Sequence, residues 1–300
     1  MKKNPNAIKD SKSDKVFYVC LYILFSIILL LVIYPVYFII VASVSDPTYV
    51  NNGHILLYPK GFTTLGYEKI FQDTKIWIGY LNTIVYTVGG TFVGLLFSIP
   101  AGYALSRKDM PYKGTVMGIL VFTMYFSGGL IPSYLVVQSL GLMDSRFLMI
   151  IMGSVSVYNI ILIRSFFISS LPQELCESAS IDGCTTQRFF ISIAVPLSKP
   201  IIAVIGLYLA VSQWNAYFTP MIYLSSTEKF PLQLVLTDIL SAVSTASKPT
   251  DDLDLILLLA KMAEVVKYGV IIVSTLPILL IYPFIQKYFV KGVMIGAIKG

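Results

Sequence analysis

Long stretches without a single charged residue are the feature that most limits what this chain can fold into. A helix needs about 20 predominantly apolar residues to cross the hydrocarbon core of a bilayer, and about 17 is the lower limit. Only 13% of the 300 residues are charged, about half the usual fraction for soluble domains. We therefore predict an all-α polytopic membrane protein with six transmembrane helices. The six charge-free runs are Val16–Ser45, Ile76–Ser106, Gly114–Met143, Phe147–Ile163, Pro200–Thr227 and Tyr268–Gln286.

The transmembrane domain is expected to cover residues 16–290, between cytoplasmic tails at 1–15 and 291–300. The fourth run is short, and we extend its helix because Arg164 can snorkel to the inner membrane surface. The first run is too long for the apolar core of a signal peptide, about 7–15 residues, so we expect it to be retained. The predicted spans are about 17–42, 77–105, 114–138, 147–169, 200–225 and 268–287.

Charge is distributed unequally between the two sides of the predicted membrane domain. The side that holds both termini carries 14 of the 22 basic residues and 6 of the 16 acidic residues. Its net charge is then +8, against −2 on the other side. Because cytoplasmic loops are enriched in Lys and Arg, we predict that both termini are cytoplasmic. The overall charge of +6 thus indicates orientation in a membrane and not a nucleic-acid partner.

The cytoplasmic loop at 170–199 has an unusual pattern of helix signals. Ser170 with Gln173 fits a capping box at the start of a short helix. Gly183 can stop that helix in a left-handed conformation, and a threonine at 185–186 can start a second helix. The loop is therefore expected to form a short helix, a tight glycine turn and a second short helix.

The first of these helices is acidic, with Glu174, Glu177 and Asp182. Connectors that lie on lipid carry Lys and Arg on their polar face, and an anionic leaflet repels acidic side chains. The charge therefore favours docking of a protein partner, with lipid contact as the alternative.

The loop resembles the EAA signature of ABC importer permeases, in which it is the coupling helix that sits in a cleft of the cytoplasmic ATPase. Ser178, Cys184 and Val195 depart from the usual residues by small or volume-similar changes. The resemblance implies a type I importer (MetI-like) fold. The residues that it assigns to ATPase coupling are Glu174, Glu177, Ala179, Asp182, Gly183, Ile193 and Pro196.

Other motifs extend the resemblance from about Tyr58 to Gly300 and favour the binding-protein-dependent carbohydrate branch (MalG-like). The stretch at 57–62 resembles permeases for complex oligosaccharides. In the C-terminal tail the resemblance implies ATPase contacts for Gly292, Gly296, Lys299 and Gly300. The remaining motifs are Asn82-Thr83, the segments 101–107, 128–134 and 140–142, Trp214-Asn215, Pro220 and the tail 290–300.

The resemblance also implies the partners and the location of the chain. It would pair with a second homologous permease subunit, two cytoplasmic ATPase subunits and an extracellular protein that delivers the sugar, in the plasma membrane of a bacterium. The chain has no G-x-x-x-x-G-K-[ST] phosphate loop, so ATP and Mg²⁺ would be bound by the ATPase subunits. We expect a transport subunit with no catalytic residue, metal or cofactor of its own.

Candidate residues for the sugar pathway are polar or aromatic side chains within the predicted spans. Sugars are held by aromatic faces and hydrogen-bonding groups in pockets that are mostly preformed. The alternative for each candidate is a hydrogen bond between helices or a place in the interfacial aromatic belt. The candidates are Tyr125, Tyr158, Asn159, Gln213, Trp214 and Asn215.

Three other functions remain to be weighed against import. A secondary transporter or channel usually places ionisable residues inside its spans, and the charge-free runs contain none. A membrane-embedded hydrolase is disfavoured because the single histidine, His54, lies in an outer loop. A purely structural membrane subunit would leave ATP-driven uptake intact when the chain is deleted.

Overall fold

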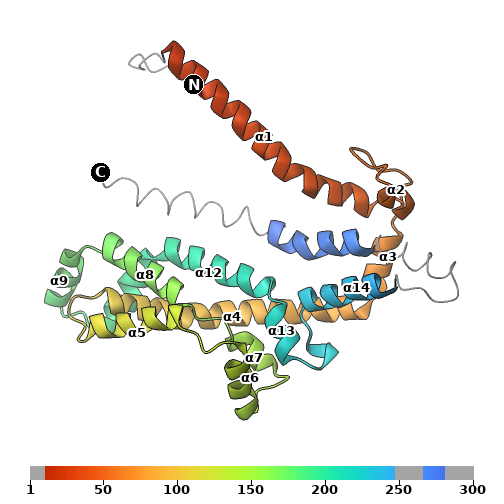
Figure 1. Ribbon diagram of the computed structural model, residues 1–300. Helices are drawn as coiled ribbons and strands as arrows, with labels where there is room; N and C mark the ends of the chain where they lie inside the picture. Colours follow the sequence, from red (N-terminus) through yellow and green to blue (C-terminus); the bar gives the residue numbers. More distant parts are fainter. Residues whose placement is uncertain (1–10, 247–265, 281–300) are drawn as a thin grey trace. The chain divides into compact units, whose positions relative to one another are not determined.

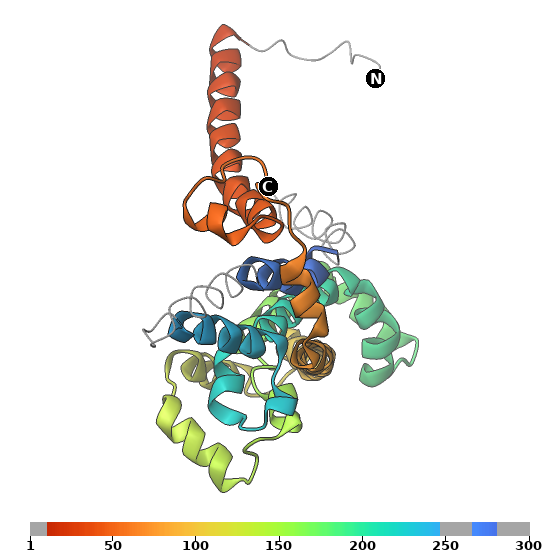
Figure 2. The ribbon, with the colours of Figure 1, turned by 90° about the vertical axis from the view of Figure 1, so that its right-hand side faces the viewer.

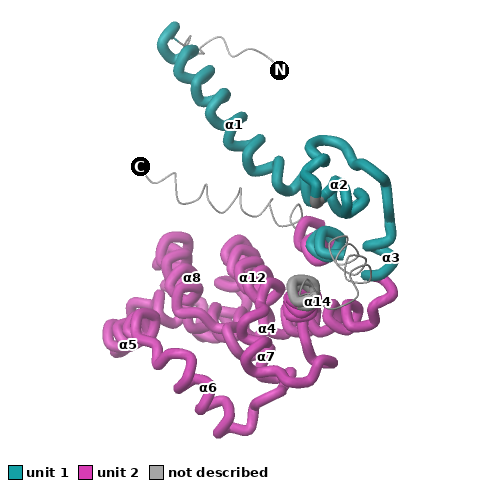
Figure 3. Tube along the Cα trace, turned by 45° about the vertical axis from the view of Figure 1, so that its right-hand side comes forward, with its two compact units in different colours: residues 1–70, 243–272 teal, residues 71–242, 273–300 magenta. Residues whose placement is uncertain are grey.

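The computed structural model of the chain describes residues 11–246 and 266–280 (Figure 1). All regular secondary structure in this part is helical, with no β-strand among the described residues. This confirms the predicted all-α class. The chain divides into two compact units (Figure 3). Unit 1 comprises residues 1–70 and 243–272, and unit 2 comprises 71–242 and 273–300.

Helix α1, Lys12–Ser43, dominates unit 1. A capping box starts it: Ser11 Oγ accepts from Asp14 N at 3.1 Å, and Ser11 N donates to Asp14 Oδ2 at 3.0 Å. Its 32 residues span about 48 Å at 1.5 Å per residue. Only its last turn, 41–43, is buried, as expected for an apolar helix whose neighbours are lipid.

Short helices follow α1 in unit 1. They are α2, Pro47–Asn51; α3, Leu65–Gln72; and a helix at Val266–Leu280, whose residues from 273 on belong to unit 2. Ser43 Oγ lies 2.8 Å from the hydroxyl of Tyr67. This hydrogen bond joins the end of α1 to α3.

Helix α4, Thr74–Ser106, runs through unit 2 and contacts α7, α8 and α12; Figure 2 looks nearly along it. Its buried face carries a small residue at every fourth position: Gly90, Gly94, Ser98 and Gly102. A Cβ on Gly90 would lie 2.6 Å from Gln213 Nε2, and one on Gly102 would lie 2.5 Å from Ile163 Cγ2. Small residues at this spacing let helix backbones approach closely.

The remaining helices of unit 2 are shorter than the predicted spans. Each of the predicted spans at 114–138, 147–169 and 200–225 consists of two helices with a break between them, and whether each pair crosses the membrane as one span stays a prediction. The observed helices are α5, Lys113–Tyr125; α6, Leu130–Ser139; α7, Arg146–Ile151; α8, Val157–Ser170; α12, Lys199–Trp214; α13, Phe218–Tyr223; and α14, Leu232–Ala246.

Glycines mark two of the breaks. Gly129 has φ of +85°, and α5 and α6 meet there at a bend of 109°. Gly153, between α7 and α8, has φ of +78°. Glycine takes such conformations at no steric cost. Because glycine is uncharged, a search for charge-free runs does not reveal these breaks.

Two described helices, α1 and α4, are long and apolar enough to cross a membrane alone. The number rises to four if the α5–α6 pair and the pair formed by Thr186–Leu197 with α12 each count as one span. Helices α8 and Val266–Leu280 are apolar but shorter. The end of the sixth predicted span, 281–287, lies outside the described residues, and the count of six remains a prediction.

Candidate functional site

The predicted helix–turn–helix loop begins with α9, Gln173–Ile181, which ends at a left-handed Gly183. The φ of Gly183 is +73°, as the sequence predicts. Cys184 N donates to Ala179 O at 2.9 Å and closes the turn. A Cβ on Gly183 would meet nothing within 4 Å, so the site requires glycine for its backbone conformation and not for space.

The expected capping box at the start of α9 is wrong. Ser170 belongs to the last turn of α8, and Pro172 occupies the N-cap position of α9 without a side-chain bond. Gln173 instead points along α9, and its Nε2 donates to Glu177 Oε1 at 2.8 Å. Glu177 is therefore oriented by a neighbour one helical turn away.

A second short helix, α10, Thr186–Phe189, follows the turn. Thr185 is its N-cap, and its side-chain oxygen accepts from Arg188 N at 3.3 Å. The chain continues through a π-helical turn, Phe190–Ala194, and the short helix α11, Val195–Leu197, before α12. The predicted helix start at 185–186 is confirmed.

Apolar side chains anchor this loop to the C-terminal ends of α4 and α8. Ala179 of α9 and Phe189 of α10 are buried in one cluster with Tyr103 and Phe167. The Tyr103 ring lies 5.3 Å from that of Phe167 and 4.9 Å from that of Phe190, centroid to centroid. Aromatic pairs at these separations add to the energy of burial.

The structure separates the predicted coupling residues into an anchoring and an exposed set. Ala179 is buried and Ile193 is half-buried, so both hold the loop to the helices beneath it. The exposed set, which a partner can reach, is Glu174, Glu177, Asp182, Gly183 and Pro196.

A recess of about 720 Å³ lies between α9 and the end of α4. On its α4 side Arg107 donates to the Tyr103 hydroxyl at 3.1 Å and pairs with Asp109 at 2.7 Å. The hydrogen bond from Arg107 lowers the pKa of Asp109, and that bond also raises the pKa of Arg107. Burial raises the pKa of Cys176, on the α9 side, so its thiol stays protonated and weakly nucleophilic at neutral pH.

A second, smaller cavity of about 90 Å³ lies in the body of unit 2, among α4, α7, α12 and α13. Among the six predicted pathway residues, Gln213 alone lines it. Its Nε2 donates to Met152 O and to Ser154 Oγ, both at 3.3 Å. The lining residues are Tyr86, Met149, Met152, Gly153, Ser212, Gln213, Ala216, Thr219, Pro220 and Pro231.

The other five pathway candidates do not line this cavity. Trp214 is buried and donates to Ser274 O at 3.2 Å, whereas Asn215 donates to Val211 O of its own helix at 2.8 Å. Asn159 is buried, and Tyr125 and Tyr158 are exposed. The four predicted tail contacts, Gly292, Gly296, Lys299 and Gly300, lie outside the described residues.

Tyr86 is the aromatic residue of the cavity wall, and it was not among the predicted pathway residues. It lies one turn after Asn82 and one turn before Gly90, on the buried face of α4. The spacing of four between Asn82, Tyr86 and Gly90 was the available signal, because residues at i and i+4 share a helix face.

The apolar helices and the exposed loop at 170–199 together fit a helical membrane protein. The chain is 37% identical over 281 residues to the polygalacturonan/rhamnogalacturonan transport system permease protein YtcP of Bacillus subtilis (strain 168), covering 90% of this chain and 94% of that protein. It is 35% identical to protein LplC of the same organism, covering 98% and 99%. The chain therefore belongs to the family of ABC importer permeases, which confirms the resemblance seen in the sequence.

A solved structure agrees with this assignment. A bacterial ABC transporter involved in the import of the acidic polysaccharide alginate matches with a TM-score of 0.84 at 33% identity, covering 94% of this chain and 100% of that chain. No family model matches the chain. The protein is a transport subunit and not an enzyme.

Proposed function

We propose that this permease imports an oligosaccharide. The support comes from its relatives: YtcP is named for polygalacturonan and rhamnogalacturonan, and the matching solved transporter imports alginate. A more distant relative, at 26% identity, is the arabinooligosaccharides permease AraQ of Halalkalibacterium halodurans. All three are named for carbohydrates of several sugar units.

The working importer then contains more chains than this one. A second homologous permease completes the translocation pathway, two cytoplasmic ATPase subunits bind ATP and Mg²⁺, and an extracellular binding protein delivers the sugar. Both termini of this chain face the cytoplasm, as the charge distribution favours.

The observation that carries the coupling role is the geometry of the loop at 170–199, which we call the inner loop. Ala179 and Phe189 fasten it to α4 and α8, while Glu174, Glu177 and Asp182 remain exposed. A partner that binds the acidic face therefore moves the helices to which the loop is fastened. ATP-driven closure of the ATPase dimer shifts the permease between inward- and outward-facing states by this route, since two packed states separated by a few kcal/mol suffice for a switch.

Purification of the complex from its native membrane tests the proposal. We expect two ATPase subunits and a second permease to copurify with this chain. In lipid nanodiscs with the binding protein, one of four probes should stimulate ATP hydrolysis: oligogalacturonides, alginate oligosaccharides, arabinooligosaccharides or galactooligosaccharides. Absence of ATPase partners would overturn the coupling role, and stimulation by none of the probes would overturn the proposed cargo class.

A further inference from the structure

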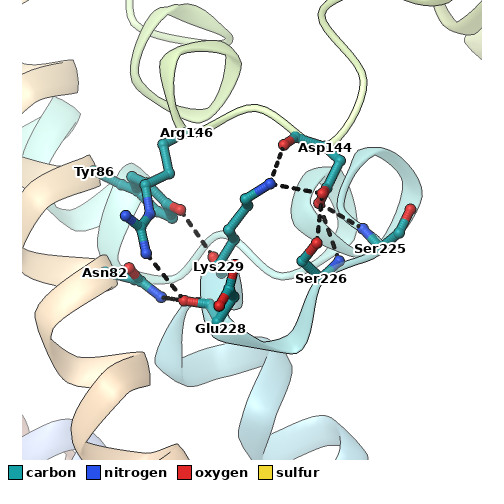
Figure 4. Close-up of polar contacts among 8 residues, drawn as sticks. All are labelled: Asn82, Tyr86, Asp144, Arg146, Ser225, Ser226, Glu228 and Lys229. Atoms are coloured by element: carbon teal, nitrogen blue, oxygen red, sulfur yellow. Dashed lines mark hydrogen bonds and ion pairs between the residues drawn. The ribbon is translucent and has the colours of Figure 1, made fainter.

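Asp144, in the loop between α6 and α7, uses every polar group that it has, and Figure 4 shows its bonds to Ser225, Ser226 and Lys229. Its N–H donates to Tyr223 O at 2.8 Å, and its carbonyl accepts from Lys229 Nζ at 2.8 Å. Its carboxylate accepts from Ser225 N and Ser226 N at 3.0 Å, from Ser226 Oγ at 2.5 Å and from Lys229 Nζ at 2.7 Å. The backbone of Asp144 takes φ of +53°, a conformation uncommon for a residue other than glycine.

The partners Ser225, Ser226 and Lys229 belong to the segment 225–230. This segment is also hydrogen-bonded to α4 and to the start of α7. Asn82 Nδ2 donates to the carbonyls of Glu228 and Phe230 at 2.9 and 3.0 Å, and the Tyr86 hydroxyl donates to Lys229 O at 2.8 Å. Arg146 Nη2 donates to Glu228 O at 3.2 Å. We call this set of contacts, centred on Asp144, the Asp144 brace.

The brace borders the cavity in unit 2. Tyr86 belongs to both, and Pro231 of the cavity wall follows directly after the braced segment. Met149 of the cavity wall lies on α7, which begins at Arg146 of the brace. A displacement of segment 225–230 would therefore move one wall of the cavity.

The number and kind of these bonds favour a contact between Asp144 and segment 225–230 that persists throughout transport. Hydrogen bonds to ionised groups are roughly twice as strong as neutral ones, and four of them converge on one carboxylate. The side chains of Asp144 and Lys229 are each only 25% exposed, so water would compensate poorly for their separation. The states of a transport cycle differ by small free energies, so a contact that opened in each cycle would need other bonds to compensate for the loss of these.

We propose that Asp144 is a positioning residue for transport, which holds segment 225–230, the outer half of α4 and the start of α7 together as one rigid body throughout the cycle. The inference rests on the alternating-access mechanism proposed above and adds to it which contact must not open. The cavity wall keeps its shape because Asp144 keeps the segment behind it in place.

A reversible cross-link distinguishes a permanent brace from a gate. The full complex, in lipid nanodiscs, carries the Asp144→Cys/Ser226→Cys pair in a background whose native cysteines Cys20, Cys176 and Cys184 are replaced by serine. The two native side chains meet at 2.5 Å, which places thiols at these positions within reach of each other. ATP hydrolysis per assembled complex is measured after reduction and after oxidation, with each single cysteine variant as a control.

We expect the reduced pair to hydrolyse ATP about tenfold more slowly than the cysteine-free parent, and oxidation to restore most of the rate. Loss of activity on oxidation would overturn the proposal, because the contact would then have to open. If the cysteine pair hydrolysed ATP at the rate of the cysteine-free parent both when reduced and when oxidised, the proposal would also be overturned. The Asp144 brace would then not be needed for hydrolysis by the assembled complex. Hydrolysis by the parent itself reports on the proposed function, so the two failures are distinguishable.

If the complex with the cysteine pair does not assemble, the single variant Asp144→Asn tests the same proposal. Asparagine tolerates positive φ and keeps an oxygen acceptor for the amides of Ser225 and Ser226, but it loses the ion pair with Lys229. We expect a reduced rate per assembled complex, smaller in effect than that of the reduced pair. A parental rate for Asp144→Asn would contradict the positioning role.

Discussion

At the scale of single residues, the inner loop depends on two positions with different requirements. Gly183 is required for a backbone angle, because φ of +73° costs a residue with a Cβ about 1–2 kcal/mol. Glu177 is exposed, and its carboxylate accepts a hydrogen bond from Gln173, on its own helix. The first residue shapes the loop, and the second is available to a partner.

Gly183→Val is expected to abolish sugar-stimulated ATP hydrolysis, because a β-branched residue at positive φ distorts the turn between α9 and α10. Gly183→Asn is the matched control, since asparagine tolerates the left-handed region and nothing crowds the site. It should retain most of the activity. Equal activity of the two variants would show that the turn conformation is not required.

Glu177→Lys is expected to weaken assembly with the ATPase without unfolding the permease. Surface substitutions change stability by about 0.5 kcal/mol or less, whereas a reversed charge on the acidic face opposes docking. Copurification of the ATPase and the melting temperature of the permease separate the two effects. Glu177→Gln, which keeps the oxygen that accepts from Gln173, should assemble better than Glu177→Lys, and normal assembly of the lysine variant would contradict the docking role.

The pH dependence of the brace follows from the pKa of Asp144, which the bonds from Lys229 and Ser226 hold below its usual range. A carboxylate with a lowered folded-state pKa stabilises the fold fully above its unfolded pKa, about 3.9, and loses this contribution as pH falls through the folded pKa. Lys229 and Arg146 are the cations of the brace. The difference in melting temperature between the parent and Asp144→Asn should therefore be constant from about pH 8 to pH 5. A change in this difference within that range would contradict a lowered pKa of Asp144.

At the scale of elements, the small-residue face of α4 and the break between α7 and α8 depend on each other. A Cβ on Gly94 would collide with Ser154 O, so the missing side chain leaves room for the irregular backbone at 152–156. Gln213 of α12 then bonds to Met152 O and Ser154 Oγ. Irregular backbone at membrane depth is tolerated only where protein surrounds it and satisfies its polar groups, and these contacts meet that condition.

Gly102→Ala tests the close packing of α4. The added Cβ would lie 2.5 Å from Ile163 Cγ2 and 3.1 Å from the backbone nitrogen of Arg164, so the helices must separate, at a cost of about 1–3 kcal/mol. Gly118→Ala in α5 is the matched control, because nothing lies within 4 Å of its Cβ position and alanine favours a helix. The fraction of complex that survives heating should fall for the first variant and not for the second.

At the scale of the whole molecule, α4 connects the two features of unit 2 on which the proposals depend. Tyr86 lines the cavity and bonds to the braced segment, and Tyr103 lies in the cluster that anchors the inner loop. The two residues are separated along the helix by about 25 Å. Helix α4 is continuous between them, with Pro100 inside it, and we expect it to carry a displacement of the loop to the cavity wall.

The orientation of the chain is tested by labelling with a membrane-impermeant thiol reagent in intact cells. In the cysteine-free background, Tyr58→Cys should be labelled and Tyr112→Cys should not, because the charge distribution places residue 58 outside and residue 112 inside. Both native side chains are highly exposed, at 77% and 83%, so accessibility within the protein does not decide the result. The reverse pattern would invert the topology.

The sequence alone determined the properties that depend on neighbouring residues. Charge-free runs indicated the helical membrane class, the acidic residues and Gly183 indicated an exposed helix–turn–helix loop, and the recurring motifs indicated the family. The capping box at Ser170 was wrong because α8 continues through that residue, and helix ends are set by packing as well as by local signals.

Only the tertiary structure decided where the long apolar segments break and which distant residues meet. The contacts of Asp144 with Ser225, Ser226 and Lys229 join residues 81 to 85 positions apart. Gln213 and Met152 meet across 61 positions. Periodicity and charge report the environment of a segment, whereas such contacts depend on how helices pack against one another, which no local pattern encodes.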